Sequence, residues 1–197
     1  ALGKGAMSNA TGGVNNVAIG DETLNNSETG GAHNIAIGGS NPGGAGGSGA
    51  LEANTTGSYN VALGIGSLSS NTVGENNIAM GYKTLGNNID GNRNIALGVS
   101  AMSSAIGGDS NFAAGKNALN DNTTGSNNIA LGEEALFENT IGANNIALGY
   151  KAGDNITEGS NNIIIGDNID ASSATVNESL NIGGILLGDI GTTSGDP

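Results

Sequence analysis

Hydrophobic and polar residues alternate in a five-residue phrase that returns along most of the chain: Asn, a bulky aliphatic residue, Ala, a second aliphatic residue and Gly, as in residues 77–81. Strict alternation over a short stretch predicts a β-strand. A recurrence at fixed length indicates a solenoid, in which each unit buries its apolar residues against the next. The closing glycines follow one another at steps of 17, 18 and 26 residues and then six steps of 17, at Gly3, Gly20, Gly38, Gly64, Gly81, Gly98, Gly115, Gly132, Gly149 and Gly166.

The remainder of each repeat has its own pattern. Four residues after the closing glycine comes a second apolar position, such as Leu85. Ten residues after the same closing glycine comes another glycine, such as Gly91. Glycine suits tight corners because it tolerates positive φ. We therefore predict a strand, a turn, a short second strand around the leucine and a second turn in each 17-residue unit. The fold class predicted is all-β, a parallel β-roll of about ten coils over residues 1–166, with strands about 4.8 Å apart and few or no helices.

The two faces of the repeated strand differ in size. Side chains alternate across a strand, so Ile78 and Met80 share a bulky face while Asn77, Ala79 and Gly81 share a small one. We expect the bulky face to point into the coil and the small face to contact other copies of the chain, although alanine could instead suit a tight corner of a single chain. The candidate interface column is Ala18, Ala36, Ala62, Ala79, Ala96, Ala113, Ala130, Ala147 and Ile164.

Two regions break the repeat. Residues 39–47 form a glycine-rich insertion, and insertions in solenoids map to loops that often bind partners. Ser40, Asn41 and Pro42 are therefore candidate partner-binding residues, with an idle insertion as the alternative. Residues 167–197 lose the period and are expected to cap the roll or to lead to a further module. Tyr59, Tyr82 and Tyr150 are candidates for stacking on sugars, or else scattered surface aromatics.

Composition restricts the partners. The net charge is −13 with five strong bases, so nucleic acid and anionic membranes are repelled. Cysteine is absent, which removes disulfides and thiolate metal sites. No run of about 18 apolar residues occurs, so no direct membrane insertion is expected. The chain starts inside a copy of the phrase, and we expect it to be an excised segment of a longer protein.

Candidate chemistry is sparse. The acidic pairs at 21–22 and 133–134 occupy positions that hold lysine in other repeats, which is typical of a solvated corner. His33, the single histidine, precedes a strand where other repeats have asparagine. Residues 167–170 offer oxygen atoms but lack the spacing of a calcium loop. We expect no catalytic, cofactor-binding or metal-binding residues, while carboxylates from separate coils could still converge as in polysaccharide-cleaving solenoids.

The repeated phrase at 16–20, 34–38, 60–64 and onward resembles the head repeat of trimeric autotransporter adhesins, the YadA-like left-handed β-roll. The resemblance covers nearly all of residues 1–166. It implies a parallel homotrimer, that is two further copies of the chain as partners, with the repeated strands turned toward one another. It also implies an extracellular role in attachment to a cell-surface receptor or glycan.

The 17-residue unit is longer than in those heads, and residues 118–125 resemble repeats of phage tail fibres. Residues 179–189 are similar to segments that precede a self-cleaving intramolecular chaperone in such fibres. This second resemblance implies a virion tail fibre in place of a bacterial surface adhesin. We therefore predict a non-enzymatic fibre segment for attachment. The alternatives are a structural spacer and, less favoured, a solenoid polysaccharide depolymerase.

Overall fold

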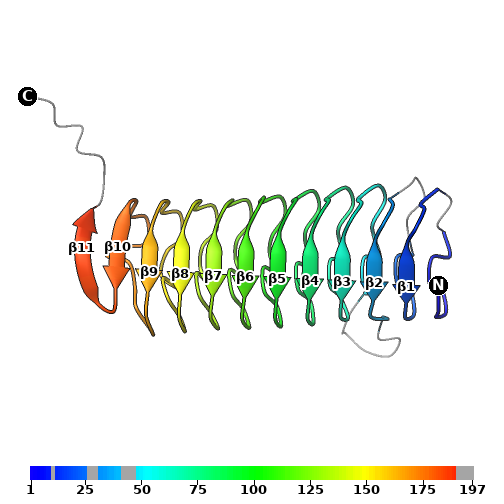
Figure 1. The fold of residues 1–197 in the computed structure, drawn as a ribbon, viewed down its shortest axis with the longest axis horizontal. Helices are drawn as coiled ribbons and strands as arrows, with labels where there is room; N and C mark the ends of the chain where they lie inside the picture. Colours follow the sequence, from blue (N-terminus) through cyan, green and yellow to red (C-terminus); the bar gives the residue numbers. More distant parts are fainter. Residues whose placement is uncertain (10–11, 26–30, 41–47, 190–197) are drawn as a thin grey trace, which may run out of the picture.

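The computed structural model describes residues 1–9, 12–25, 31–40 and 48–189, and the side chains up to 185. Eleven strands form one sheet along a rod of stacked coils (Figure 1). No helix occurs in these residues, so the all-β prediction is confirmed for them. The strands are β1 (Val17–Ile19), β2 (Ile35–Ile37), β3 (Val61–Leu63), β4 (Ile78–Met80), β5 (Ile95–Leu97), β6 (Phe112–Ala114), β7 (Ile129–Leu131), β8 (Ile146–Leu148), β9 (Ile163–Ile165), β10 (Ser179–Ile182) and β11 (Ile185–Asp189).

The predicted parallel stacking is confirmed. Strands β1 to β10 pair in sequence order, each parallel to the next, so about nine turns of the solenoid lie between the first and the last. The register pairs equivalent residues of consecutive repeats: Ala79 pairs with Ala62 on one side and with Ala96 on the other. The insertion between β2 and β3 does not disturb this register. Strand β11 pairs antiparallel with β10 and ends the stack.

The predicted second strand around the leucine is wrong. The residues after each closing glycine form a chain of turns, because alternate residues take the left-handed conformation, with φ of 54° at Lys83 and 49° at Leu85. Backbone of this kind cannot extend into a strand. The leucine is nevertheless fully buried and forms a column through the rod, Leu24, Leu51, Leu68, Leu85, Met102, Leu119 and Leu136.

The assignment of the two strand faces is also wrong, and the structure reverses it. The small face points into the coil, where Ala79 and its equivalents are buried within a single chain. Residues that a single chain already covers cannot contact another copy, so the predicted interface column is the inner wall of the core. That column is Ala18, Ala36, Ala62, Ala79, Ala96, Ala113, Ala130, Ala147 and Ile164.

The narrow interior explains why the inner residues are small. Each coil closes around one leucine from the turns that follow the closing glycine, which we call the turn arm, and the asparagine that precedes the strand, leaving room for a methyl group from the strand itself. Three residues after the leucine, most coils bury a further asparagine, namely Asn54, Asn71, Asn88, Asn122 and Asn139. The side-chain oxygen of Asn77 accepts the backbone N–H of Asn94 at 2.9 Å, and the Asn94 amide donates to the Gly108 carbonyl at 2.7 Å. Buried polar groups need such partners. The ladder comprises Asn16, Asn34, Asn60, Asn77, Asn94, Asn111, Asn128, Asn145 and Asn162.

Candidate binding surfaces

The outward face of the strands is a continuous apolar surface. Because the alanines point inward, the bulky residues on either side of them face away from the core. They are 43% exposed at Val17 and Met80 and 40% exposed at Ile35, and they are half-buried from β6 to β9. Strands β1 to β9 contain no charged residue. Two columns of apolar side chains, all of them large except Ala114, thus run along about 40 Å of rod. We call this surface the strand face. Its first column is Val17, Ile35, Val61, Ile78, Ile95, Phe112, Ile129, Ile146 and Ile163.

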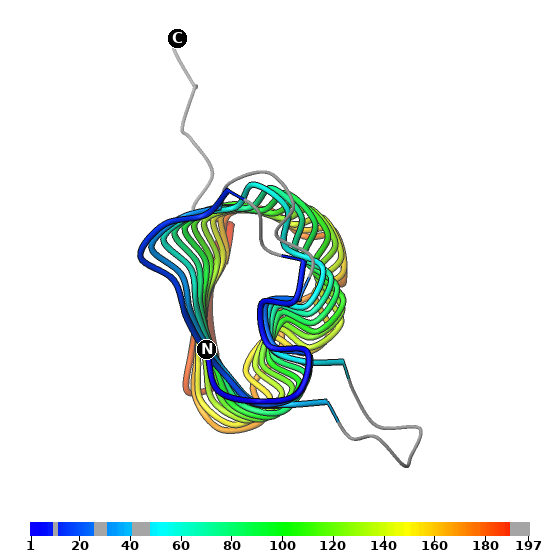
Figure 2. The same cartoon turned by 90° about the vertical axis from the view of Figure 1, so that its right-hand side faces the viewer.

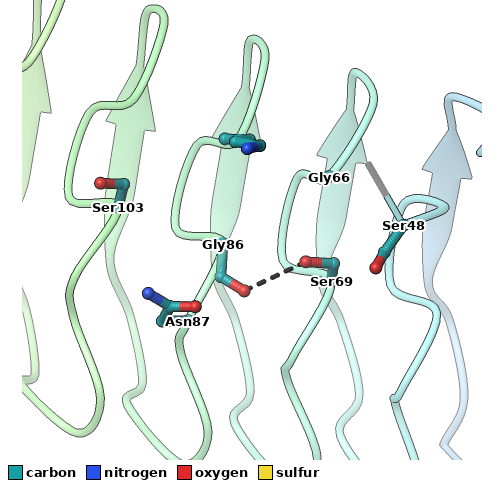
Figure 3. Close-up of a pocket in the computed structure, with 7 residues that line it drawn as sticks. Ser48, Gly66, Ser69, Gly86, Asn87 and Ser103 are labelled. Atoms are coloured by element: carbon teal, nitrogen blue, oxygen red, sulfur yellow. Dashed lines mark hydrogen bonds between the residues drawn. The ribbon is translucent and has the colours of Figure 1, made fainter. Parts of the chain in front are cut away.

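The wall opposite the strand face bends inward in cross-section (Figure 2). On this wall a hollow of about 350 Å³ is lined by Ser48, Gly66, Ser69, Lys83, Gly86, Asn87 and Ser103 (Figure 3). A second hollow of about 400 Å³ shares Ser48 and Ser69 with it and extends toward the N-terminal coils. The lining is polar and comes from consecutive coils, and Figure 3 shows the Ser69 hydroxyl donating to the Gly86 carbonyl at 3.1 Å.

The structure does not bring the predicted partner-binding residues together. Asn41 and Pro42 lie outside the described residues. Ser40 is half-buried, and its backbone N–H donates to the Asp21 carbonyl at 2.9 Å. Tyr59 lies at the corner that precedes β3, so it is remote in the coil from the two other tyrosines.

The tyrosines have cationic or aromatic neighbours. Tyr59 stacks on His33 with ring centroids 5.0 Å apart and ring planes 9° apart. The side-chain nitrogen of Asn15 lies 3.0 Å from the His33 ring, so this histidine belongs to a surface ladder. Tyr82 and Tyr150 are exposed just after β4 and β8, and each has a lysine ammonium near its ring. Sequence reasoning selected both tyrosines but missed the lysines beside them, although each lysine follows its tyrosine directly.

Three acidic residues, Asp109, Glu133 and Glu134, pair with bases of neighbouring coils in the described part of the chain. Glu133 lies 2.9 Å from Lys116, and Glu134 lies 3.3 Å from Lys151. The Glu133 hydrogen bond raises the pKa of Lys116, and the Glu134 hydrogen bond does the same for Lys151. These contacts agree with the interpretation of the pair at 133–134 as a solvated corner.

One pair of carboxyl groups does converge from adjacent coils. Burial and a side-chain hydrogen bond to Asp170 raise the pKa of Asp154 to about 6. Carboxyl groups in hydrogen-bond contact are closer than the separation of about 5–9.5 Å at which glycosidase pairs work. Sequence reasoning missed this pair because its members stand 16 residues apart and only one of them lies in the regular repeat. Within the described residues no group of three or more histidine, cysteine, aspartate or glutamate side chains is placed to hold a metal ion.

In comparisons with known proteins, no family model, no curated protein and no solved structure matches the chain. Among the residues that the structure describes, none belongs to a helix with the length and apolarity to span a membrane. The two surfaces available for binding are the strand face and the polar wall opposite to it.

Proposed function

We propose that the chain is a non-enzymatic segment of an extracellular fibre, assembled from three parallel copies, that attaches to a cell surface or glycan. The observation that carries this proposal is the uncharged apolar strand face along the whole stack, whose bulky side chains a single chain leaves exposed or half-buried. Contiguous apolar surfaces of this extent are rare on monomers and mark sites of association. We assign the strand face to a second and a third copy of the same chain.

A copy of the same chain is the partner that fits this surface. The apolar side chains recur at the strand spacing in two columns, so a matching partner must carry apolar residues at the same rise, and a parallel copy does so along its full length. Homo-oligomers with cyclic symmetry also bring the same patch together from each subunit. Three copies and a left-handed winding are favoured by the resemblance to adhesin heads.

Sedimentation equilibrium of the full chain tests the assembly. A mass of three chains supports the proposal, whereas a monomer contradicts it and a dimer contradicts the threefold arrangement. The Ile78→Glu/Ile95→Glu double variant should give monomers, because it puts charges into the apolar contact. Lys116→Gln, on an exposed side chain outside the strand face, is the control and should keep the assembly.

Chemical cross-linking keeps this test valid if a charged variant fails to fold. The chain has no cysteine, so Ile95→Cys introduces a single thiol on the strand face. It should cross-link between chains with a short bis-maleimide, while Ser104→Cys on the turn arm should not. Equal cross-linking of the two variants would show that the strand face is not the interface.

Attachment is tested by whole-cell and glycan-array binding of the assembled chain. Three identical sites on one fibre convert weak contacts into strong attachment. Binding that is lost in the monomeric variant supports attachment, whereas absence of binding to any cell or glycan leaves the structural spacer as the function. Release of reducing sugar from a bound polysaccharide would instead establish a depolymerase.

A further inference from the structure

The dipeptide Tyr-Lys occurs twice in the same place of the coil, at Tyr82-Lys83 and at Tyr150-Lys151, four 17-residue coils apart. In both copies the lysine ammonium lies near the preceding tyrosine ring, 5.4 Å from its centroid in the first and 5.8 Å in the second. Both lysine residues follow the closing glycine by two positions. The two Tyr-Lys pairs therefore have the same local structure, and what differs between them is the set of neighbouring residues.

The surroundings differ in charge. Lys151 forms an ion pair at 3.3 Å with Glu134, which stands in the preceding coil. The equivalent residue in front of Lys83 is Gly66, and across residues 1–9, 12–25, 31–40 and 48–189 no carboxylate lies within ion-pair distance of the Lys83 ammonium. In a chain of net charge −13, this is a cation that the fold leaves without an acidic partner.

The surroundings also differ in volume. Four coils apart, Phe137 corresponds to Ser69 and Asp154 corresponds to Gly86. These exchanges leave beside Lys83 the hollow of about 350 Å³, within the range of about 300–1,000 Å³ that small ligands occupy. A Cβ atom on Gly86 would lie 3.3 Å from the Lys83 carbonyl oxygen, so glycine keeps this wall open.

We propose that this hollow binds an acidic saccharide, whose carboxylate pairs with Lys83 in the way that Glu134 pairs with Lys151. This inference rests on the proposed attachment function and assigns it a site. The Ser69 hydroxyl, which already donates to the chain, accepts from a sugar hydroxyl, and the Ser103 hydroxyl, which already accepts from the Asn120 amide at 2.9 Å, donates to one. The Asn87 amide, exposed at the edge, offers both a donor and an acceptor.

The position of the hollow suits this role. It lies on the wall opposite the strand face, so association of three copies through their strand faces leaves three such sites pointing outward. Tyr82 does not line the hollow, but its ring centroid lies 5.4 Å from the ammonium of Lys83, which does. The second hollow, which continues from Ser48 and Ser69, gives room for a longer saccharide.

The experiment uses the full assembled chain on a glycan array in which each oligosaccharide with a uronic or sialic acid is paired with its neutral counterpart. Calorimetry of the strongest pair follows. The acidic member should bind at least about tenfold more tightly, the scale of one charge-assisted hydrogen bond. Lys83→Gln should remove this preference. Lys151→Gln, which deletes the equivalent cation already paired with Glu134, is the matched control and should keep it.

A second variant tests the comparison between the two copies. Gly66→Glu places a carboxylate in front of Lys83 as Glu134 stands in front of Lys151, at a coil position that accepts φ of 60° in Glu134. It should block the acidic saccharide as effectively as Lys83→Gln while leaving the sedimentation mass unchanged.

Three results would overturn the site. The first is an array in which no acidic member exceeds its neutral counterpart. The second is equal binding by Lys83→Gln and Lys151→Gln. The third is undiminished cell binding by the Lys83→Gln assembly, in which case attachment stands and this hollow is not its site. The sedimentation mass and the whole-cell binding of the unchanged chain judge the proposed function separately.

Discussion

Asn88 and Ala105 occupy the same place in consecutive coils, and the buried side-chain oxygen of Asn88 finds no donor among the described residues. Asn54, Asn71, Asn88, Asn122 and Asn139 form a second asparagine ladder. In it an amide donates to the oxygen of the asparagine 17 residues earlier, as Asn88 does to Asn71 at 2.7 Å. Alanine cannot donate. The unpartnered oxygen of Asn88 is thus the consequence of one missing asparagine.

Ala105→Asn should therefore stabilise the protein by about 1–2 kcal/mol, because it restores a buried hydrogen bond to a group that has none. The new amide can donate to Asn88, and the new oxygen can accept from Asn122, as in the neighbouring coils. Urea unfolding measures the effect. Ala101→Asn, at a buried site outside the ladder, should destabilise, and a loss of stability in Ala105→Asn would contradict the explanation.

The small size of Gly153 is compensated by the large side chain of Ile164 in the same coil. Gly153 stands where other coils have leucine, and Ile164 stands where they have alanine. A Cβ atom on Gly153 would lie 3.3 Å from Ile164. Gly153→Leu alone should overpack and cost about 1–3 kcal/mol, and Ile164→Ala alone should leave a cavity that costs about 2–5 kcal/mol. The double variant should recover part of both losses, since it restores the leucine and the alanine of the neighbouring coil. Ile156, which would lie equally close to a Cβ atom on Gly153, still occupies the place of Asn139. Additive losses in the double-mutant cycle would contradict the exchange.

The closing glycines are required by contact between coils. A Cβ atom on Gly132, which has φ of 141°, would lie 2.1 Å from the Gly149 carbonyl oxygen, and backbone of the next coil cannot move away without breaking the sheet. We expect Gly132→Ala to abolish cooperative folding, measured by circular dichroism and thermal unfolding. Gly183→Ala is the control. It also has positive φ, at 61°, but has no atom within 4 Å of the added Cβ, so its cost should be about 1 kcal/mol.

Stability near the end of the stack should depend on pH through Asp154. Its pKa in the folded chain is raised to about 6, whereas an unfolded aspartate has a pKa of about 3.9. The folded chain therefore holds more protons between these values, and this pair's contribution to stability decreases as pH rises from about 4 to about 6. Asp154→Asn should flatten that slope.

Hydrogen exchange of β9 and β10 from pH 4 to 7.5, corrected for the intrinsic exchange rate, measures the effect of Asp154. Asp121→Asn controls for the loss of one negative charge elsewhere on the rod. If the two variants show the same slope, the pair with Asp170 is not the cause.

The sequence was sufficient to predict much of the fold. The strand positions, the parallel register and the 17-residue coil could all be predicted, because a stacked unit must repeat its buried and turning residues at every turn. The phrase at 77–81 shows this directly, since its strand residues 78–80 pair with their counterparts 17 residues away. The turn arm was predicted less well, because Lys83 and Leu85 have positive φ although neither is a glycine, so their residue types do not indicate a turn.

The direction of the two strand faces was decided by the tertiary structure alone. Alternation in residues 78–80 distinguishes a large face from a small one but does not say which is enclosed. The answer depends on how far apart the two walls stand, and that distance is set by Leu85 and Asn77 packing across the interior. Alanine fits the remaining space and isoleucine does not, so the bulky residues face outward. The hollow beside Lys83 has the same origin, since it exists only where Gly66, Ser69 and Gly86 meet from successive coils.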